Sequence, residues 1–219
     1  MRPAATVLLE TDRYVIVAKP SGLAVHRGEC RDRVTALDVV RDHVGRWVYP
    51  VHRLDRGTSG ALLFALDPES AAALQGCFDA AEVEKVYVAL VRGVPPDGGV
   101  IDHPVPKSEG GPRVPAVTAY RRLCAGDGCS LVEARPRTGR FHQVRRHLKH
   151  LGHPLIGDSN YGVGRLNRDF RDRYGLARLA LHAAELAFPD PWTRAPVRVL
   201  APLPEDLAAP LARLGFPVG

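Results

Sequence analysis

The segment from Val51 to Gly60 holds the side chains of this chain that are best placed to do chemistry. A single carboxylate, Asp55, lies between Arg53 and Arg56, and His52 precedes them. Neighbouring guanidinium groups stabilise an ionised carboxylate, so Asp55 is a poor proton donor that suits nucleophilic or electrostatic work. The alternative is an ordinary surface cluster of ion pairs, which contributes about 0 to 1 kcal/mol per pair.

The sequence around this segment also indicates how Asp55 is positioned. Gly57 and Gly60 interrupt the polar stretch, and the apolar run 61–65 follows directly. A polar loop that leads into a short apolar strand is a common way to hold a reactive side chain at a sheet edge or cleft floor. We therefore expect a strand over residues 60–66, directly after the Asp55 loop.

A second segment, residues 135–149, is strongly basic, with six Lys or Arg and no acidic residue. A helix that begins near Arg140 would separate an apolar face from a basic face. The apolar face would hold Phe141, Val144, Leu148 and Leu151, and the basic face His142, Arg145, Arg146 and Lys149. Such a basic face fits an anionic partner. A solvated amphipathic helix is the alternative.

The rest of the pattern predicts an α+β fold. We expect strands at 7–9, 14–18, 84–92, 116–124, 130–137, 179–188 and 196–203. We expect helices at 35–44, from Pro68 onward after an Asp67 N-cap, and at 204–214, with Gly45 and Gly215 as C-terminal caps. Residues 95–115 should be mostly loop, and Lys19, at the turn after the second strand, should be exposed.

Composition limits the class of protein further. The 219 residues suffice for one large domain, and the net charge of +6, carried mostly by arginine, favours an anionic partner. The four cysteines, Cys30, Cys77, Cys124 and Cys129, form no C-x-x-C pair, which indicates reduced thiols in the cytoplasm. The apolar runs are far shorter than the ~20 residues of a membrane helix. The histidine spacing does not suit a helical zinc site, so no metal is expected.

Several motifs together resemble one known family. The run His52-Arg53-Leu54-Asp55, followed by Thr58-Ser59-Gly60, is similar to the catalytic motif of the RluA-type RNA pseudouridine synthases. Lys85-Val86-Tyr87 resembles the Lys-x-Tyr of this family, and segments 138–148 and 152–162 resemble its second diagnostic block. Two positions depart from the family pattern, because Ala18 replaces an asparagine and Phe141 a small or polar residue.

The resemblance implies a fold and a catalytic group. The implied fold is a mixed, mainly antiparallel sheet in two halves, with flanking helices and a cleft between the halves. We expect one catalytic domain over residues 1–219 with no N-terminal domain of the S4 type. The resemblance makes Asp55 the nucleophile, Arg145 its ion-pair partner, and Tyr87 the ring beneath the target base. Isomerisation involves neither redox change nor group transfer, so no cofactor is expected.

The resemblance also implies an RNA partner. The target base must be flipped out of the RNA, with Arg53 entering the vacated space. The other expected RNA contacts are His52, Arg137, Arg140, His142, Gln143, Arg146 and Lys149. The motifs are most similar to a subgroup that modifies acceptor-stem uridine 65 of tRNA, and we expect a monomer. An rRNA uridine as target and a non-catalytic RNA-binding or chaperone module are the two alternatives.

Overall fold

The computed structural model describes residues 5–27 and 34–217. The described chain has five helices and mostly antiparallel strands, which confirms the expected α+β class. It divides into two compact units, each built from two separate stretches of sequence. The first unit comprises residues 1–84 and 183–202, and the second comprises residues 85–182 and 203–219. The cleft and the single domain expected over 1–219 stay predictions.

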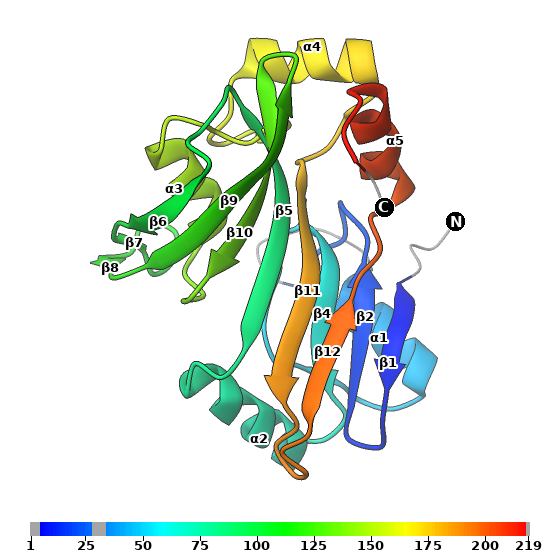
Figure 1. Ribbon diagram of the computed structural model, residues 1–219. Helices are drawn as coiled ribbons and strands as arrows, with labels where there is room; N and C mark the ends of the chain where they lie inside the picture. The colour runs from blue at the N-terminus through cyan, green and yellow to red at the C-terminus, as the bar shows by residue number, and fades with distance from the viewer. Residues whose placement is uncertain (1–4, 28–33, 218–219) are drawn as a thin grey trace. The chain divides into compact units, whose positions relative to one another are not determined.

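The first unit is a sheet with two helices (Figure 1). Its strands are β1 (Thr6–Glu10), β2 (Tyr14–Lys19), β3 (Tyr49–Pro50), β4 (Ser59–Ala65), most of β11 (Leu181–Pro189), and β12 (Pro196–Leu200). The order is β1-β2-β4-β11-β12, with β3 beside β4. β4 is buried along its whole length, and Leu63 packs in one core with Ile16 and Phe188.

Both helices of the first unit begin where the sequence predicts, and α1 also ends there. Thr35 caps α1 (Ala36–Val44) by accepting a hydrogen bond from the backbone of Asp38, whose side chain bonds back to the Thr35 N–H. Gly45 ends α1 in the left-handed conformation. α2 (Pro68–Asp79) starts with the predicted Asp67 cap and proline. A reciprocal cap satisfies two backbone donors that would otherwise lack partners.

The second unit carries a twisted four-stranded sheet and three helices. Its elements are most of β5 (Glu84–Arg92), β6 (Gly98–Asp102), β7 (Val105–Pro106), β8 (Arg113–Val114), β9 (Val117–Gly126), β10 (Cys129–Pro136), α3 (Gln143–His150), α4 (Gly164–Tyr174) and α5 (Glu205–Arg213). The strand order is β5-β10-β9-β6, all antiparallel, and β7 pairs with β8 separately. Asp127 and Gly128, both at positive φ, form the tight turn between β9 and β10.

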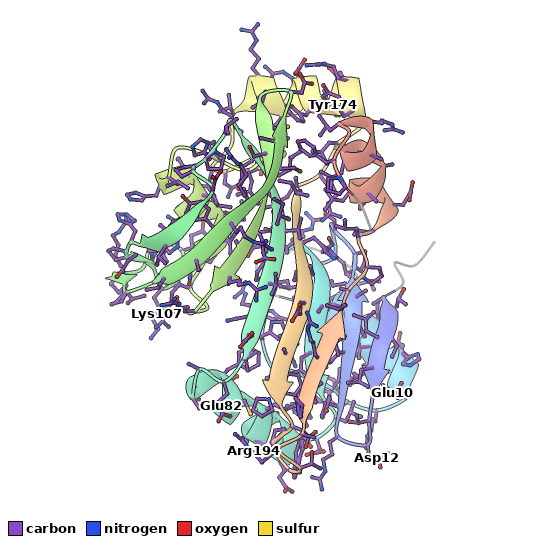
Figure 2. All side chains as sticks on the ribbon, in the orientation of Figure 1. Glu10, Asp12, Glu82, Lys107, Tyr174 and Arg194 are labelled. Atoms are coloured by element: carbon purple, nitrogen blue, oxygen red, sulfur yellow. The ribbon has the colours of Figure 1, made fainter. Side chains whose placement is uncertain are left out.

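The sequence did not predict α4. Phe170 is the single buried residue of this helix, and Leu166 and Tyr174, four residues to either side, pack against the same core. Six of its eleven residues are Arg or Asp, so this short apolar stripe is inconspicuous in the sequence. Its C-terminal end is fixed to the β9–β10 turn, where the Tyr174 hydroxyl donates to the Asp127 carboxylate (Figure 2). Arg173 also pairs with Asp127, at 3.0 Å from its Nη2. α4 is therefore held both by these polar contacts and by the packing of Leu166, Phe170 and Tyr174 against the core.

Two general expectations can be compared with the described residues. Across residues 5–27 and 34–217, no helix is long and apolar enough to span a membrane. Cys77, Cys124 and Cys129 are free thiols, whereas Cys30 lies outside the described residues.

Candidate active site

The Asp55 loop of the first unit joins β3 to β4, and hydrogen bonds of its backbone contribute to holding it. Thr58 N–H donates to the Asp55 carbonyl at 3.0 Å. The Arg56 carbonyl accepts from Gly22 N–H at 2.8 Å, and the Arg56 side chain returns a bond of 3.0 Å from Nε to the Gly22 carbonyl. These bonds fasten the Asp55 loop to the turn that follows β2.

Lys19 lies beneath the same loop, and the expectation that it is exposed is wrong. Its side chain is only 1% exposed. The ammonium donates to the carbonyls of Leu23 at 2.7 Å, Pro20 at 3.0 Å and Arg56 at 3.2 Å. A buried ammonium is tolerated when all of its donors find acceptors. Lys19 therefore clamps the chain one residue after Asp55.

Gly60 is the second residue of β4, directly after the loop, at a position with no room for a side chain. Its φ is +118°, and a Cβ there would lie 2.1 Å from the Ala183 carbonyl oxygen within the same unit. Both the backbone conformation and the close approach require glycine. The start of β4 is therefore fixed relative to β11.

The two residues before Leu54 face different surroundings. His52 is half-buried, accepts a bond of 3.2 Å from Leu63 N–H to Nε2, and stacks on Phe78 with ring centroids 5.3 Å apart. These contacts give His52 a packing role, and the RNA contact expected for it stays a prediction. Arg53 is exposed and is available for RNA.

Arg145, in the second unit, forms a buried two-bond ion pair with Asp158. Nε and Nη2 of Arg145 each lie 2.8 Å from one carboxylate oxygen, and the side chains are 7% and 0% exposed. Burial alone would raise the pKa of Asp158. The hydrogen bonds and charge of Arg145, with the N–H groups of Tyr161 and Asn160, outweigh burial and hold that pKa below its usual value. The pairing of Arg145 with Asp55 stays a prediction.

Cationic side chains surround the ring of Tyr161. The guanidinium carbons of Arg146 and Arg145 lie 4.9 and 5.0 Å from its centroid, and Lys149 Nζ lies 5.6 Å away. Contact of this kind stabilises a cation by roughly 0.5 to 2 kcal/mol, depending on desolvation. Arg146 Nε is also buried without a hydrogen-bond partner among the described residues. The Tyr161 ring thus lies near three cationic side chains of α3.

His142, the residue before α3, has an unusual backbone conformation. α3 begins at Gln143, three residues after the predicted start at Arg140, because His142 adopts the left-handed conformation at φ 52° and ψ 30°. A non-glycine residue in this region is uncommon and is frequently found at functional sites. His142 Nδ1 lies 3.0 Å from the Tyr161 hydroxyl, and its ring stacks on Phe141 at 3.8 Å.

Gln143 is buried and uses its whole amide inside the second unit. Its Nε2 donates to Val117 O and Thr118 Oγ1, both at 3.0 Å. Its Oε1 accepts from Thr138 Oγ1 at 2.6 Å and from Arg140 N–H at 3.0 Å. All four hydrogen-bonding positions of the amide are filled. This geometry joins α3 to β9 and argues against the RNA contact expected for Gln143.

The remaining predicted residues of the second unit are distributed as follows. Tyr87 is half-buried on β5 and packs against the core that includes Val132. Lys85, two residues earlier, has a lowered pKa because it is buried. Arg137, Arg140 and Lys149 are exposed, as phosphate contacts need to be.

The sequence prediction gave no role to Asp158 and Tyr161. Both fall within the block 152–162 that resembles the family, and that was the sole signal for them. Nothing in their local pattern indicates that they contact Arg145. Within the described ranges, no three His, Cys, Asp or Glu side chains gather in a way that could hold a metal ion.

Comparisons with known proteins define the class of molecule. Residues 13–150 match a family model described as RNA pseudouridylate synthase. The solved structure of human RNA pseudouridylate synthase domain containing 4 has a TM-score of 0.79 and 28% identity, covering 96% of this chain and 93% of that one. The structure of human RNA pseudouridylate synthase domain containing 1 has a TM-score of 0.78 and 28% identity, with 95% and 88% covered. The fold is that of a pseudouridine synthase.

Three curated relatives that share one name are similar to this chain over most of its length. A Vibrio cholerae protein named tRNA pseudouridine synthase C is 37% identical, over 96% of each chain. A Salmonella typhimurium protein of the same name is 37% identical, over 96% of this chain and 90% of that one. A third, from Haemophilus ducreyi, is 38% identical over 91% of both. The chain belongs to the RluA-type RNA pseudouridine synthase family, which confirms the resemblance of its motifs.

Proposed function

We propose that this protein isomerises uridine to pseudouridine in tRNA, at the acceptor-stem uridine 65. One observation carries the proposal. The matched family segment 13–150 contains both the clamped Asp55 loop and Arg145, and relatives named tRNA pseudouridine synthase C match nearly the whole chain. The exposed arginines beside both segments fit a phosphate backbone, and binding should weaken steeply with salt.

The proposed reaction breaks the N1–C1′ bond of uridine and forms a C5–C1′ bond. C5 loses its proton, N1 gains one, and the oxidation state does not change. Asp55 acts as the nucleophile, at ribose C1′ or at the base, and divides one difficult step into easier ones. The chemistry needs no cofactor, because an ionised carboxylate supplies the covalent partner.

The other predicted site residues are assigned the following roles. Arg145 pairs with Asp55, and Tyr87 stacks against the flipped base. Flipping costs a few kcal/mol of unstacking, which Arg53 offsets by filling the vacated space. Phosphate contacts fall to the basic residues of 137–149, namely Arg137, Arg140, Arg146 and Lys149, with His142 beside them. Gln143 is assigned to packing, whereas the half-buried His52 keeps its proposed RNA contact.

The experiment uses purified protein and transcripts labelled with tritium at uridine C5, without added metal or nucleotide. We expect release of label from a tRNA transcript and none from rRNA fragments. Asp55→Asn should reduce release by about 10³-fold or more and leave RNA binding largely intact. The matched control is Asp12→Asn, an exposed carboxylate in the same unit.

Other outcomes would overturn the proposal in distinct ways. Release from rRNA alone would replace the substrate. An Asp55→Asn variant with full biological effect would indicate a non-catalytic RNA-binding or chaperone module. We further propose that the enzyme acts as a monomer in the cytoplasm; sedimentation at working concentration tests the first of these points.

A further inference from the structure

We propose that Asp158 is a positioning residue for the reaction and acts by fixing the guanidinium of Arg145. The inference rests on the proposed function, in which Arg145 pairs with Asp55. The pair joins Nε and Nη2 of Arg145 to the two carboxylate oxygens of Asp158, each at 2.8 Å. Two parallel bonds fix the plane of the guanidinium as well as its location, which one bond would not do.

The Asp158 carboxylate is itself held in place. Its Oδ1 accepts from the N–H groups of Asn160 at 2.9 Å and Tyr161 at 3.0 Å, in addition to Arg145. The carboxylate is fully buried, so water does not compete for these bonds. Because these N–H groups fix the Asp158 carboxylate, it presents its oxygen atoms to Arg145 in a single orientation.

The loop that carries Asp158 is fastened to α4. Asn167 accepts from Gly157 N–H at 2.8 Å and donates from Nδ2 to the Asp158 carbonyl at 2.9 Å. A Cβ on Gly157, at φ +75°, would lie 1.8 Å from the Arg178 carbonyl oxygen, and one on Gly162 would lie 2.4 Å from that of Asp158. Packing this close restricts the loop to one path.

Tyr161 adds a third constraint on Arg145. Its ring centroid lies 5.0 Å from the guanidinium carbon, while its backbone N–H bonds Asp158. One short loop thus supplies both the carboxylate along one edge of Arg145 and an aromatic ring near its face. Preorganised charge is effective in catalysis because no reorganisation is needed when the reaction occurs.

The main experiment is a double-mutant cycle with Asp158→Asn, Arg145→Gln and the double variant. The single-turnover rate of pseudouridine formation and the Kd for tRNA are measured separately. We expect Asp158→Asn to lower the rate by at least about tenfold and to change Kd by less than about twofold. In the double variant the rate should equal that of Arg145→Gln alone, because Asp158 acts through Arg145.

The control and a second variant separate positioning from loss of folding. Asp169→Asn removes an exposed carboxylate that pairs with Arg173 on α4 of the same unit, and it should leave both rate and Kd unchanged. Asn167→Ala loosens the loop without touching the carboxylate. We expect a fall in rate of about two- to fivefold that disappears in the Arg145→Gln background.

A spectroscopic measurement tests the pair without any assay of activity. The Arg145 Nε–H should give a ¹⁵N–¹H signal that is protected from solvent exchange in the wild-type protein and lost or unprotected in Asp158→Asn. Wild-type protein with this protected signal but no isomerase activity would refute the proposed function and leave the pair standing. An unprotected signal, an Asp158→Asn rate equal to wild type, or rate effects that add in the cycle would overturn the inference.

Discussion

The Asp55 loop of the first unit and the Arg145 region of the second are held by different kinds of interaction. Lys19 donates to three main-chain carbonyl oxygens, of which that of Arg56 is in the Asp55 loop and the other two are in the segment after β2. The Arg145 region depends on a match between two side chains, Arg145 and Asp158. Main-chain acceptors are supplied by any residue, whereas a two-bond carboxylate pair needs one particular partner.

This difference predicts how much stability the protein loses when one residue of either region is replaced. Removing Lys19 removes a donor and leaves polar but uncharged carbonyls. Removing Arg145 leaves the Asp158 carboxylate buried without its cation, which costs more than a lost hydrogen bond. The comparison therefore predicts a larger loss of stability from the second unit than from the first.

The largest effect is expected from Arg145→Met. It leaves the Asp158 carboxylate buried without its cation and should lower the free energy of unfolding by about 3 to 5 kcal/mol. Urea unfolding measures this change. The double variant Arg145→Met with Asp158→Leu removes both charges and should recover most of the stability but no activity. A loss below about 1 kcal/mol for the single variant would contradict the comparison.

A smaller effect is expected from Lys19→Met. This variant keeps the apolar stem but leaves three carbonyls without their donor, so the free energy of unfolding should fall by about 2 to 3 kcal/mol. The same urea titration checks it. Lys107→Met, on an exposed side chain labelled in Figure 2, is the matched control and should change stability by less than about 0.5 kcal/mol. Equal losses for Lys19→Met and the control would show that the clamp does not stabilise the loop.

The smallest effect concerns pH, and it depends on the second unit. His147 is fully buried, with Nδ1 2.9 Å from Thr118 Oγ1 and Nε2 2.9 Å from the His103 carbonyl. Burial, together with His103 and His150, lowers the pKa of His147 below 6.5, although the bond to the His103 carbonyl and the charge of Asp102 oppose this.

The sign of the pH effect follows from the unfolded chain. Because the unfolded His147 takes up a proton near pH 6.5 and the folded one resists it, the free energy of unfolding should fall as the pH drops below about 6.5. Asp158, whose pKa is lowered on folding, should contribute a second loss below about pH 3.8. Unfolding at pH 7.5 and 5.5 measures the first step, which should shrink in His147→Gln. An unchanged step would assign it to other groups.

Much of the fold could be predicted because its local signals agree with its tertiary structure. α2 has its cap and proline, β5 spans the predicted residues 84–92, and the predicted β9–β10 hairpin forms. α4 was not predicted because Arg and Asp fill most of the positions around Leu166, Phe170 and Tyr174, whose spacing of four residues is its main helical signal. Lys19 was misjudged because a lysine at a turn normally faces water, and burial with three acceptors is a tertiary fact.

The site was predictable to a similar degree. Asp55, Tyr87 and Arg145 could be named from motifs, and their roles stay predictions. The partner of Arg145 in the second unit could not be named, since Asp158 lies thirteen residues further along a loop. Likewise, a glutamine in a basic segment resembles an RNA contact until its amide is found to be fully bonded, as in Gln143.

The interleaving of the two units has a consequence for biosynthesis. The core of the first unit includes Leu186 and Phe188, and a core of the second includes Leu207 and Leu211. All four lie after residue 185, so a nascent chain on the ribosome lacks the side chains that complete either core until those residues have been synthesised. Neither unit can complete its core from its N-terminal stretch alone, and a chain truncated before residue 186 would expose both cores to chaperones and proteases.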